Sequence, residues 1–198
     1  MSPAGRSRPV TDPTQPTSEA DLFTRSATRL ATLFYASLSM LGQFEPVAVE
    51  DLPAGYRTLL AHNDHMTVAL ESFHDSRVSV RALDEWRDDA SYARASVLSR
   101  QSDGATVQFG MMRIWLADLP ADAQEEIASK SAPLGRVLIE HNVLREVELI
   151  TLFKITPGTL LQEHLGVNGK QAIFGRTAQI LVEERPTVQL LEIVKLPV

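Results

Sequence analysis

The chain has 198 residues, of which 44% are hydrophobic and 22% charged, and its formal net charge is −6. This length and apolar fraction fit one domain with a real core and exclude wholesale disorder. The absence of cysteine excludes disulfide scaffolds, thiolate zinc sites and cysteine nucleophiles. An acidic chain is also a poor match to nucleic acid or anionic lipid, so we expect a small-molecule or protein partner.

The first 18 residues are rich in proline, serine and threonine, and we expect a mobile tail there. Arg6 and Arg8 are not followed by the apolar stretch of a signal peptide. The longest weakly polar run, residues 30–41, has 12 residues, whereas a membrane-spanning helix needs about 20. The sequence therefore predicts a cytoplasmic protein with no membrane contact, and a single domain over residues 19–198.

Apolar residues at helical spacing follow Ser18, a plausible N-cap, and predict a helix over residues 18–41 that ends before Gly42. A shorter helix is expected over residues 56–63. From Met66 the apolar residues alternate with polar ones, which predicts that the first strand begins there.

The rest of the chain reads mainly as strands joined by tight turns. Three segments can adopt the backbone conformations of tight turns: Asp103-Gly104, Asn168-Gly169 and residues 183–186. Further strands are expected over residues 93–100, 106–115, 145–155, 171–182 and 188–196. Two helices, over residues 120–130 and 133–140, interrupt them. Antiparallel strands with helices grouped in this way predict an α+β domain.

The common catalytic motifs are missing. His62 and His65 are three residues apart, but the sequence has no His-Glu-x-x-His pattern and the other histidines stand alone. Solvated or helix-end histidines explain them, and we expect no metal. No Gly-x-Ser-x-Gly elbow is present, and residues 166–170 lack the spacing of a phosphate-binding loop.

Two charged residues stand inside apolar strand patterns. Arg94 lies among small and apolar neighbours, and Glu192 is flanked by leucine and isoleucine. A lone charge in a strand usually points to solvent, because burying an unpaired charge is costly. The alternative places both at a pocket, where the arginine forks a ligand carboxylate and the glutamate holds or accepts a proton. Periodicity alone does not choose between them.

Six short motifs stand in a distinctive order along residues 59–197: Met66-Thr67, Arg94, Gly110, Ala132-Pro-Leu-Gly-Arg136, Phe174-Gly-Arg176 and Glu192. In order and spacing this series resembles the chorismate pyruvate-lyases. The Pro-Leu-Gly-Arg segment is the most specific single piece.

The resemblance implies a six-stranded antiparallel sheet whose helices cover an enclosed ligand pocket. Enzymes of that family convert chorismate to 4-hydroxybenzoate and pyruvate without metal or organic cofactor. By this resemblance the catalytic residues are Arg94, which clamps the ring carboxylate, and Glu192, which binds the ring hydroxyl. The residues expected to border the substrate are Met66, Thr67, Gly110, Leu134 and Arg176.

Other functions stay open. A family member could act on a different acidic or enolic small molecule, for example as a cyclase. The effector domain of GntR-type repressors has a related fold, but these repressors place a basic winged helix-turn-helix in front of it. Up to Val49 the chain has four basic and four acidic residues, so no recognition helix is expected there. A purely structural interaction protein is the last alternative, if Arg94 and Glu192 face water.

Overall fold

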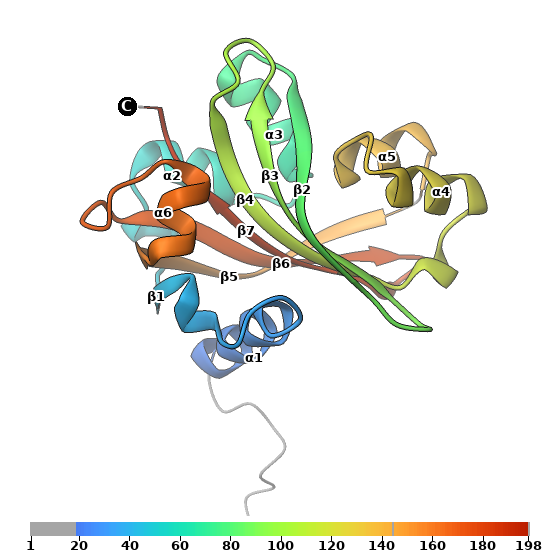
Figure 1. Ribbon diagram of the computed structural model, residues 1–198, viewed down its shortest axis with the longest axis horizontal. Coiled ribbons are helices and arrows are strands. Elements are labelled where there is room, and N and C mark those ends of the chain that lie inside the picture. Colours follow the sequence, from blue (N-terminus) through green and yellow to red (C-terminus); the bar gives the residue numbers. More distant parts are fainter. Residues whose placement is uncertain (1–18, 144, 198) are drawn as a thin grey trace, which may run out of the picture.

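The computed structural model describes residues 19–143 and 145–197. Its centre is a strongly twisted, open sheet of seven antiparallel strands in the order β1-β5-β6-β7-β4-β3-β2 (Figure 1). The strands are β1 (Gly42–Pro46), β2 (Val78–Arg87), β3 (Tyr92–Arg100), β4 (Thr106–Ile114), β5 (Arg145–Pro157), β6 (Ile173–Val182) and β7 (Arg185–Val194). The helices are α1 (Glu19–Ala31), α2 (Ala54–Leu60), α3 (Met66–His74), α4 (Ala121–Ser129), α5 (Leu134–Glu140) and α6 (Thr159–Leu165). The predicted α+β class is confirmed.

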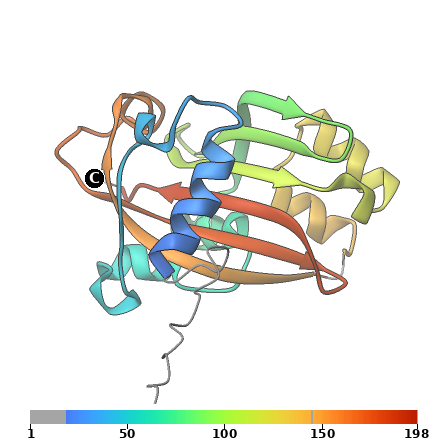
Figure 2. The same ribbon diagram turned by 90° about the horizontal axis from the view of Figure 1, so that it is seen from below.

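One face of the sheet is covered by α1 and α6. Helix α1 runs across the strands (Figure 2), and its residues Ala27 and Leu30 are fully buried. They share one apolar cluster with Phe109 on β4 and Leu191 on β7. Because an amphipathic helix gains most of its stability by burying its apolar side, this cluster fixes α1 on the sheet.

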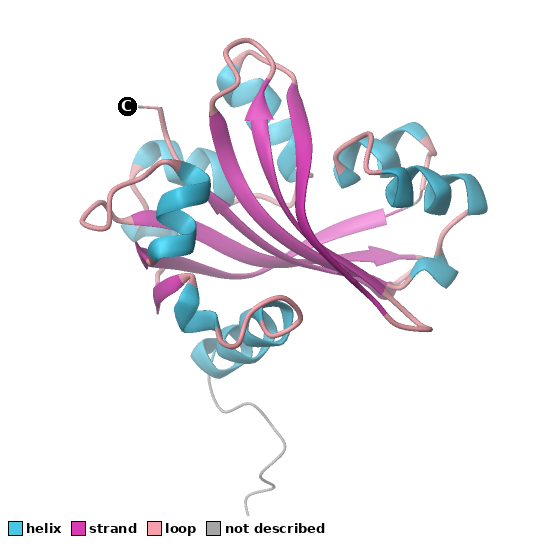
Figure 3. Cartoon of the chain, in the orientation of Figure 1, coloured by secondary structure: helices cyan, strands magenta, loops and turns pink. Residues whose placement is uncertain are grey.

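The opposite face carries two separate apolar clusters, each under its own pair of helices (Figure 3). Helices α2 and α3 contribute Leu59 and Leu70 to one cluster. Helices α4 and α5 contribute Ile127 and Leu138 to the other. The two helix pairs meet where α3 packs against α5.

The chain reversal between β6 and β7 confirms the turn predicted at residues 183–186. Glu183 and Glu184 have φ values of 49° and 65°. Positive φ at both central residues matches the right-handed twist of a two-residue hairpin. The turn, together with a shift of register between Ile180 and Leu181, places Arg176 on β6 opposite Glu192 on β7.

The predicted strand at Met66 is wrong, because residues Met66–His74 form helix α3. Met66, Thr67 and Leu70 are buried on one side of this helix, whereas Val68 is 46% exposed. The alternation that suggested a strand combined an exposed valine with a buried leucine. Three or four residues are too few to separate a period of 2 from one of 3.6.

The long helix predicted over residues 18–41 is also shorter in the structure. Helix α1 ends at Ala31, and the apolar residues after it pack against the same cluster from a loop and a short 3-10 turn. The strand β1 and the helix α6 were not expected. With β1 the sheet has seven strands, one more than the resemblance implied.

The expected tail, residues 1–18, lies outside the described residues. In the part of the chain that the structure describes, no helix has the length and apolar character needed to cross a membrane.

Truncating Leu30 to alanine tests whether α1 is an integral part of the domain. The side chain is fully buried, so Leu30→Ala should lower the free energy of unfolding by roughly 2–5 kcal/mol. Urea denaturation measures this change. Arg25→Ala, at an exposed position of the same helix, is the control and should change it by less than about 0.5 kcal/mol. Equal effects of the two variants would mean that α1 is only loosely attached.

Candidate functional site

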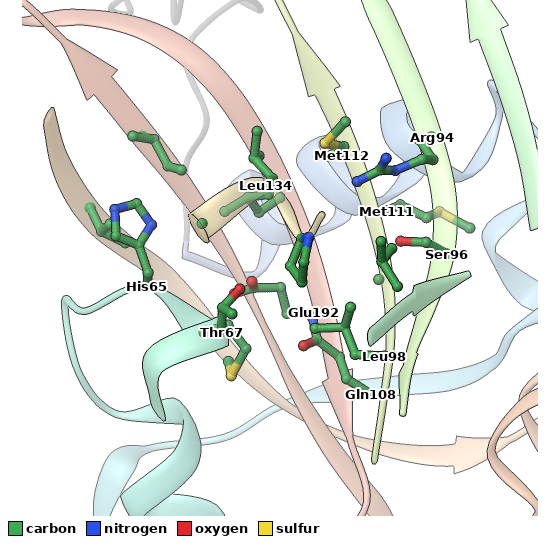
Figure 4. Close-up of a pocket in the computed structure, with 18 of the residues that line it drawn as sticks. His65, Thr67, Arg94, Ser96, Leu98, Gln108, Met111, Met112, Leu134 and Glu192 are labelled. Carbon is green, nitrogen blue, oxygen red and sulfur yellow. The ribbon is translucent and has the colours of Figure 1, made fainter. Parts of the chain in front are cut away.

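A pocket lies on the face of the sheet that α2, α3, α4 and α5 cover, where the two apolar clusters of that face meet (Figure 4). Counting the open solvent at its mouth, it contains about 620 Å³ free of protein atoms. The structure brings all the sequence-predicted site residues into its lining: Met66, Thr67, Arg94, Gly110, Leu134, Arg176 and Glu192. These residues come from six different helices and strands.

The floor of the pocket is a row of residues in register across four strands. Ser96 on β3 lies opposite Gly110 on β4, Gly110 lies opposite Glu192 on β7, and Glu192 lies opposite Arg176 on β6. At Gly110, a Cβ atom would have no backbone atom nearer than 3.7 Å. The glycine thus leaves space above the floor that any larger side chain would occupy.

Arg94 extends from β3 over the pocket beside Met112 (Figure 4). It is only 2% exposed, and its Nε and Nη1 atoms have no hydrogen-bond partner among the described residues. Burial lowers the pKa of this guanidinium, and the nearby Tyr92 and Glu85 partly offset the effect. Burial also raises the pKa of Tyr92 to about 12, so its hydroxyl stays neutral. Arg94 therefore presents donors that the protein leaves unused.

Arg176 and Glu192 form a buried ion pair. The Nε atom of Arg176 donates to a Glu192 carboxylate oxygen at 2.7 Å, and Arg176 is fully buried. Its Nη1 and Nη2 atoms donate to the carbonyl oxygens of His62 and Asp64. Each nitrogen of Arg176 thus has an acceptor. Arg176 positions Glu192 and the loop before α3, and the net positive charge of the pocket comes from Arg94.

The starts of two helices close the pocket from above the sheet. Met66 and Thr67 begin α3, and Leu134 begins α5. A Cβ atom on Gly135 would lie 2.9 Å from the Thr67 Oγ1 atom, so the glycine allows the two helices to approach. The helix dipole gives this end of α3 a partial positive charge, which adds to that of Arg94.

His65 also lines the pocket. Its spacing from His62, the only feature of it that stood out in the sequence, did not indicate this position. Its Nε2 atom accepts a hydrogen bond from Arg145 Nε, at the start of β5. Burial, with Arg145 and Arg176 nearby, lowers its pKa to about 4. The imidazole is therefore neutral at neutral pH, and its contact with Arg145 joins the loop before α3 to the sheet.

Gln108 on β4 is another polar lining residue that the sequence did not indicate. It is 5% exposed and its Oε1 atom has no partner among the described residues. A glutamine inside a strand pattern gives no signal of burial, because the same residue is common on solvated strand faces. The solvent-facing alternative for Arg94 and Glu192 is wrong, since Glu192 is also only 6% exposed.

Among the described residues, no group of three or more histidine and carboxylate side chains is arranged to hold a metal ion. The ring of His62 contacts the carbonyl oxygen of Leu59 at 2.8 Å. His65 contacts Arg145. The two histidines thus have protein partners and do not converge.

Comparison with known proteins gives structural likeness only. No family model matches the chain, and no curated protein sequence matches it. The effector domain of PhnF from Mycobacterium smegmatis is similar, with 12% identity, a TM-score of 0.52, and coverage of 76% of this chain and 91% of that domain.

A longer PhnF structure from Mycobacterium smegmatis matches with 13% identity and a TM-score of 0.50, over 65% of this chain and 62% of that one. The chain thus spans less than two thirds of that protein. The ligand-binding domain of a GntR-family regulator from Bordetella bronchiseptica also matches, with 15% identity, a TM-score of 0.45, and coverage of 60% of this chain and 85% of that domain. At these identities the likeness shows the fold alone, which is that of the PhnF effector domain.

Acidification should destabilise the protein through His65. Its pKa in the folded protein is about 4, below the ordinary 6.5, so the unfolded chain binds more protons at acidic pH. The stability that the neutral ring contributes is complete above about pH 6.5 and is lost as the pH falls toward 4. Urea denaturation across this interval should show a shallower decline for His65→Gln than for the wild type.

His141→Gln provides a control of opposite sign. Hydrogen bonds and charge from Glu126 and Asp122 raise the pKa of His141. The charged ring contributes to the free energy of unfolding. This contribution is complete below about pH 6.5 and is lost as the pH rises through the folded-state pKa. Between about pH 6.5 and 4 the ring is protonated in both the folded and the unfolded state, so His141→Gln should follow the slope of the wild type there. Between pH 6.5 and the raised folded-state pKa, this variant should lack the stability that the wild type gains on acidification. A wild-type slope for His65→Gln below pH 6.5, together with a wild-type slope for His141→Gln above it, would contradict the assignment of both histidines.

Proposed function

We propose that the pocket binds a small aromatic carboxylate, and that Arg94 holds the carboxylate group. The observation that carries this proposal is the buried Arg94 guanidinium, whose Nε and Nη1 atoms have no partner among the described residues. A planar guanidinium forks a carboxylate with two parallel, charge-assisted hydrogen bonds. Such a ligand supplies both the missing acceptors and the missing negative charge.

The surroundings of Arg94 favour one anionic group on an otherwise flat, apolar ligand. Apolar side chains line the same pocket, among them Met112, Val147, Ile180 and Leu190. Such side chains suit an aromatic ring better than a polar skeleton. The acidic residue Glu192 is already paired with Arg176, so it does not cancel the charge of Arg94. The local charge thus favours a monoanion even though the whole chain carries −6.

A second, more specific candidate is the reaction of the family that the sequence resembles. It is favoured by the convergence of Met66, Arg94, Leu134 and Glu192 on one pocket. In that reaction the ether bond of chorismate breaks, and the ring carbon bearing the hydroxyl loses its hydrogen as the ring becomes aromatic. The enolpyruvyl methylene gains a hydrogen, so that 4-hydroxybenzoate and pyruvate account for every atom. Arg94 and Glu192 would orient the ring while the closed pocket excludes water.

The binding of 4-hydroxybenzoate to the purified protein tests the first proposal, and isothermal titration calorimetry measures it. Arg94→Met removes the charge but keeps the length of the side chain, and should weaken binding about 100-fold or more. Arg81→Met, at an exposed position of β2, is the matched control and should bind as the wild type does. Unchanged affinity in Arg94→Met would overturn the proposed carboxylate site.

The same preparation separates the two candidates. Incubation with chorismate, followed by detection of pyruvate, should show product that Arg94→Met fails to form if the lyase proposal holds. Binding of 4-hydroxybenzoate without turnover of chorismate would favour a ligand-binding domain, as in the effector domains of similar fold, and would reject the lyase.

A further inference from the structure

Gln108 is the second buried polar side chain of the pocket with unused hydrogen-bonding capacity. It is 5% exposed, and its Oε1 atom is buried with no partner among the described residues. An amide oxygen buried in this way costs about 1–3 kcal/mol relative to one that is hydrogen-bonded. Native structures contain few such groups, and a functional role is a usual reason for them.

The amide of Gln108 lies beside the free space of the pocket. Gln108 and Gly110 are on the same side of β4, and a Cβ atom placed on Gly110 would be 3.1 Å from the Gln108 Nε2 atom. Gly110 lies opposite Glu192. The amide therefore extends over the gap that Gly110 leaves, next to the Glu192 end of the pocket floor.

Gln108 and Arg94 are at opposite ends of the pocket (Figure 4). Gln108 lies opposite Leu98, and Leu98 is four residues along β3 from Arg94, which corresponds to about 13 Å of backbone. An arginine side chain and one aromatic ring fill a span of this length. A ligand whose carboxylate is held by Arg94 thus brings the far side of its ring to Gln108.

We infer that Gln108 recognises a hydroxyl group on the ring of the ligand, opposite the carboxylate, and so determines the preference of the pocket for hydroxylated aromatic acids. This inference rests on the proposed carboxylate site. The Nε2 atom, which lies nearest the gap at Gly110, donates to the hydroxyl oxygen, and a half-turn of the amide brings Oε1, the acceptor that the protein leaves unused, to the hydroxyl hydrogen instead.

The neighbouring Glu192 does not satisfy Gln108, whose Oε1 atom has no partner among the described residues. One Glu192 oxygen already accepts from Arg176 at 2.7 Å, and its charge is neutralised by that pair. Gln108 is neutral and adds hydrogen bonding without repelling an anion. A site built to pair with a hydroxyl group rejects an analogue without one, because its own buried polar atom is then left unsatisfied.

Calorimetric titration of the wild type with 4-hydroxybenzoate and with benzoate tests the inference. The wild type should bind 4-hydroxybenzoate about 10-fold or more tightly than benzoate, as one satisfied buried hydrogen bond predicts. Gln108→Met, which keeps the size of the side chain but removes the amide, should bring the ratio of the two dissociation constants close to one while benzoate still binds. Gln101→Met, at an exposed position in the β3–β4 connection, should keep the wild-type ratio.

Each outcome has a distinct meaning. Equal affinities for the two acids in the wild type, or a ratio preserved in Gln108→Met, would overturn the role of Gln108 and leave the carboxylate site standing. Failure of the wild type to bind either acid would overturn the carboxylate site and the inference together. Thermal unfolding of Gln108→Met establishes that the variant is folded, and the wild-type ratio tests the inference independently of it.

Discussion

The structure is organised around one electrostatic constraint, a guanidinium buried at a pocket with no ion-pair partner in the described part of the chain. An isolated charge in such surroundings costs several kcal/mol unless it is paired. Arg94 nevertheless keeps two nitrogen atoms free of partners in the described part of the chain. The surrounding fold must supply enough stability from its apolar clusters to hold this group in place. An anionic ligand pairs with the guanidinium and relieves this unfavourable burial. The pocket therefore binds a carboxylate in preference to a neutral ligand.

The sheet explains how the site is held. Its register places Gly110 between Ser96 and Glu192, which leaves a gap in an otherwise continuous layer of side chains. The neighbouring Arg176–Glu192 pair is satisfied by hydrogen bonds to the loop before α3. The pair therefore contributes rigidity while leaving the charge of Arg94 uncancelled. Side chains mounted on paired strands are positioned more precisely than side chains on loops, and this suits a site that distinguishes ligands by hydrogen bonds.

The sequence predicted the α+β class and the hairpin turns at Asp103-Gly104 and at residues 183–186, whereas the turn at Asn168-Gly169 connects helix α6 to β6 and not two strands. Arg94 and Glu192 were singled out because a charge inside an apolar strand is unusual, although only the resemblance to chorismate pyruvate-lyases placed them at a pocket. Gln108 was not, because a neutral polar residue fits a solvated strand equally well, and only the register reveals which side of β4 is enclosed. The strand expected at Met66 is a helix, since the few apolar residues there fit both periods. The packing of α3 against α5 determines the secondary structure of this segment, and these contacts join residues that are distant in the sequence.

Arg94 is retained for a ligand at a cost in stability, which the free energy of unfolding without ligand measures. Urea denaturation of the wild type and Arg94→Met, both free of aromatic acids, gives the comparison. The methionine variant should be more stable by about 1 kcal/mol or more, because a buried charge without an ion pair is replaced by an apolar side chain of similar length. A variant less stable than the wild type would contradict it, since Arg94 would then be a structural residue whose interactions the fold requires.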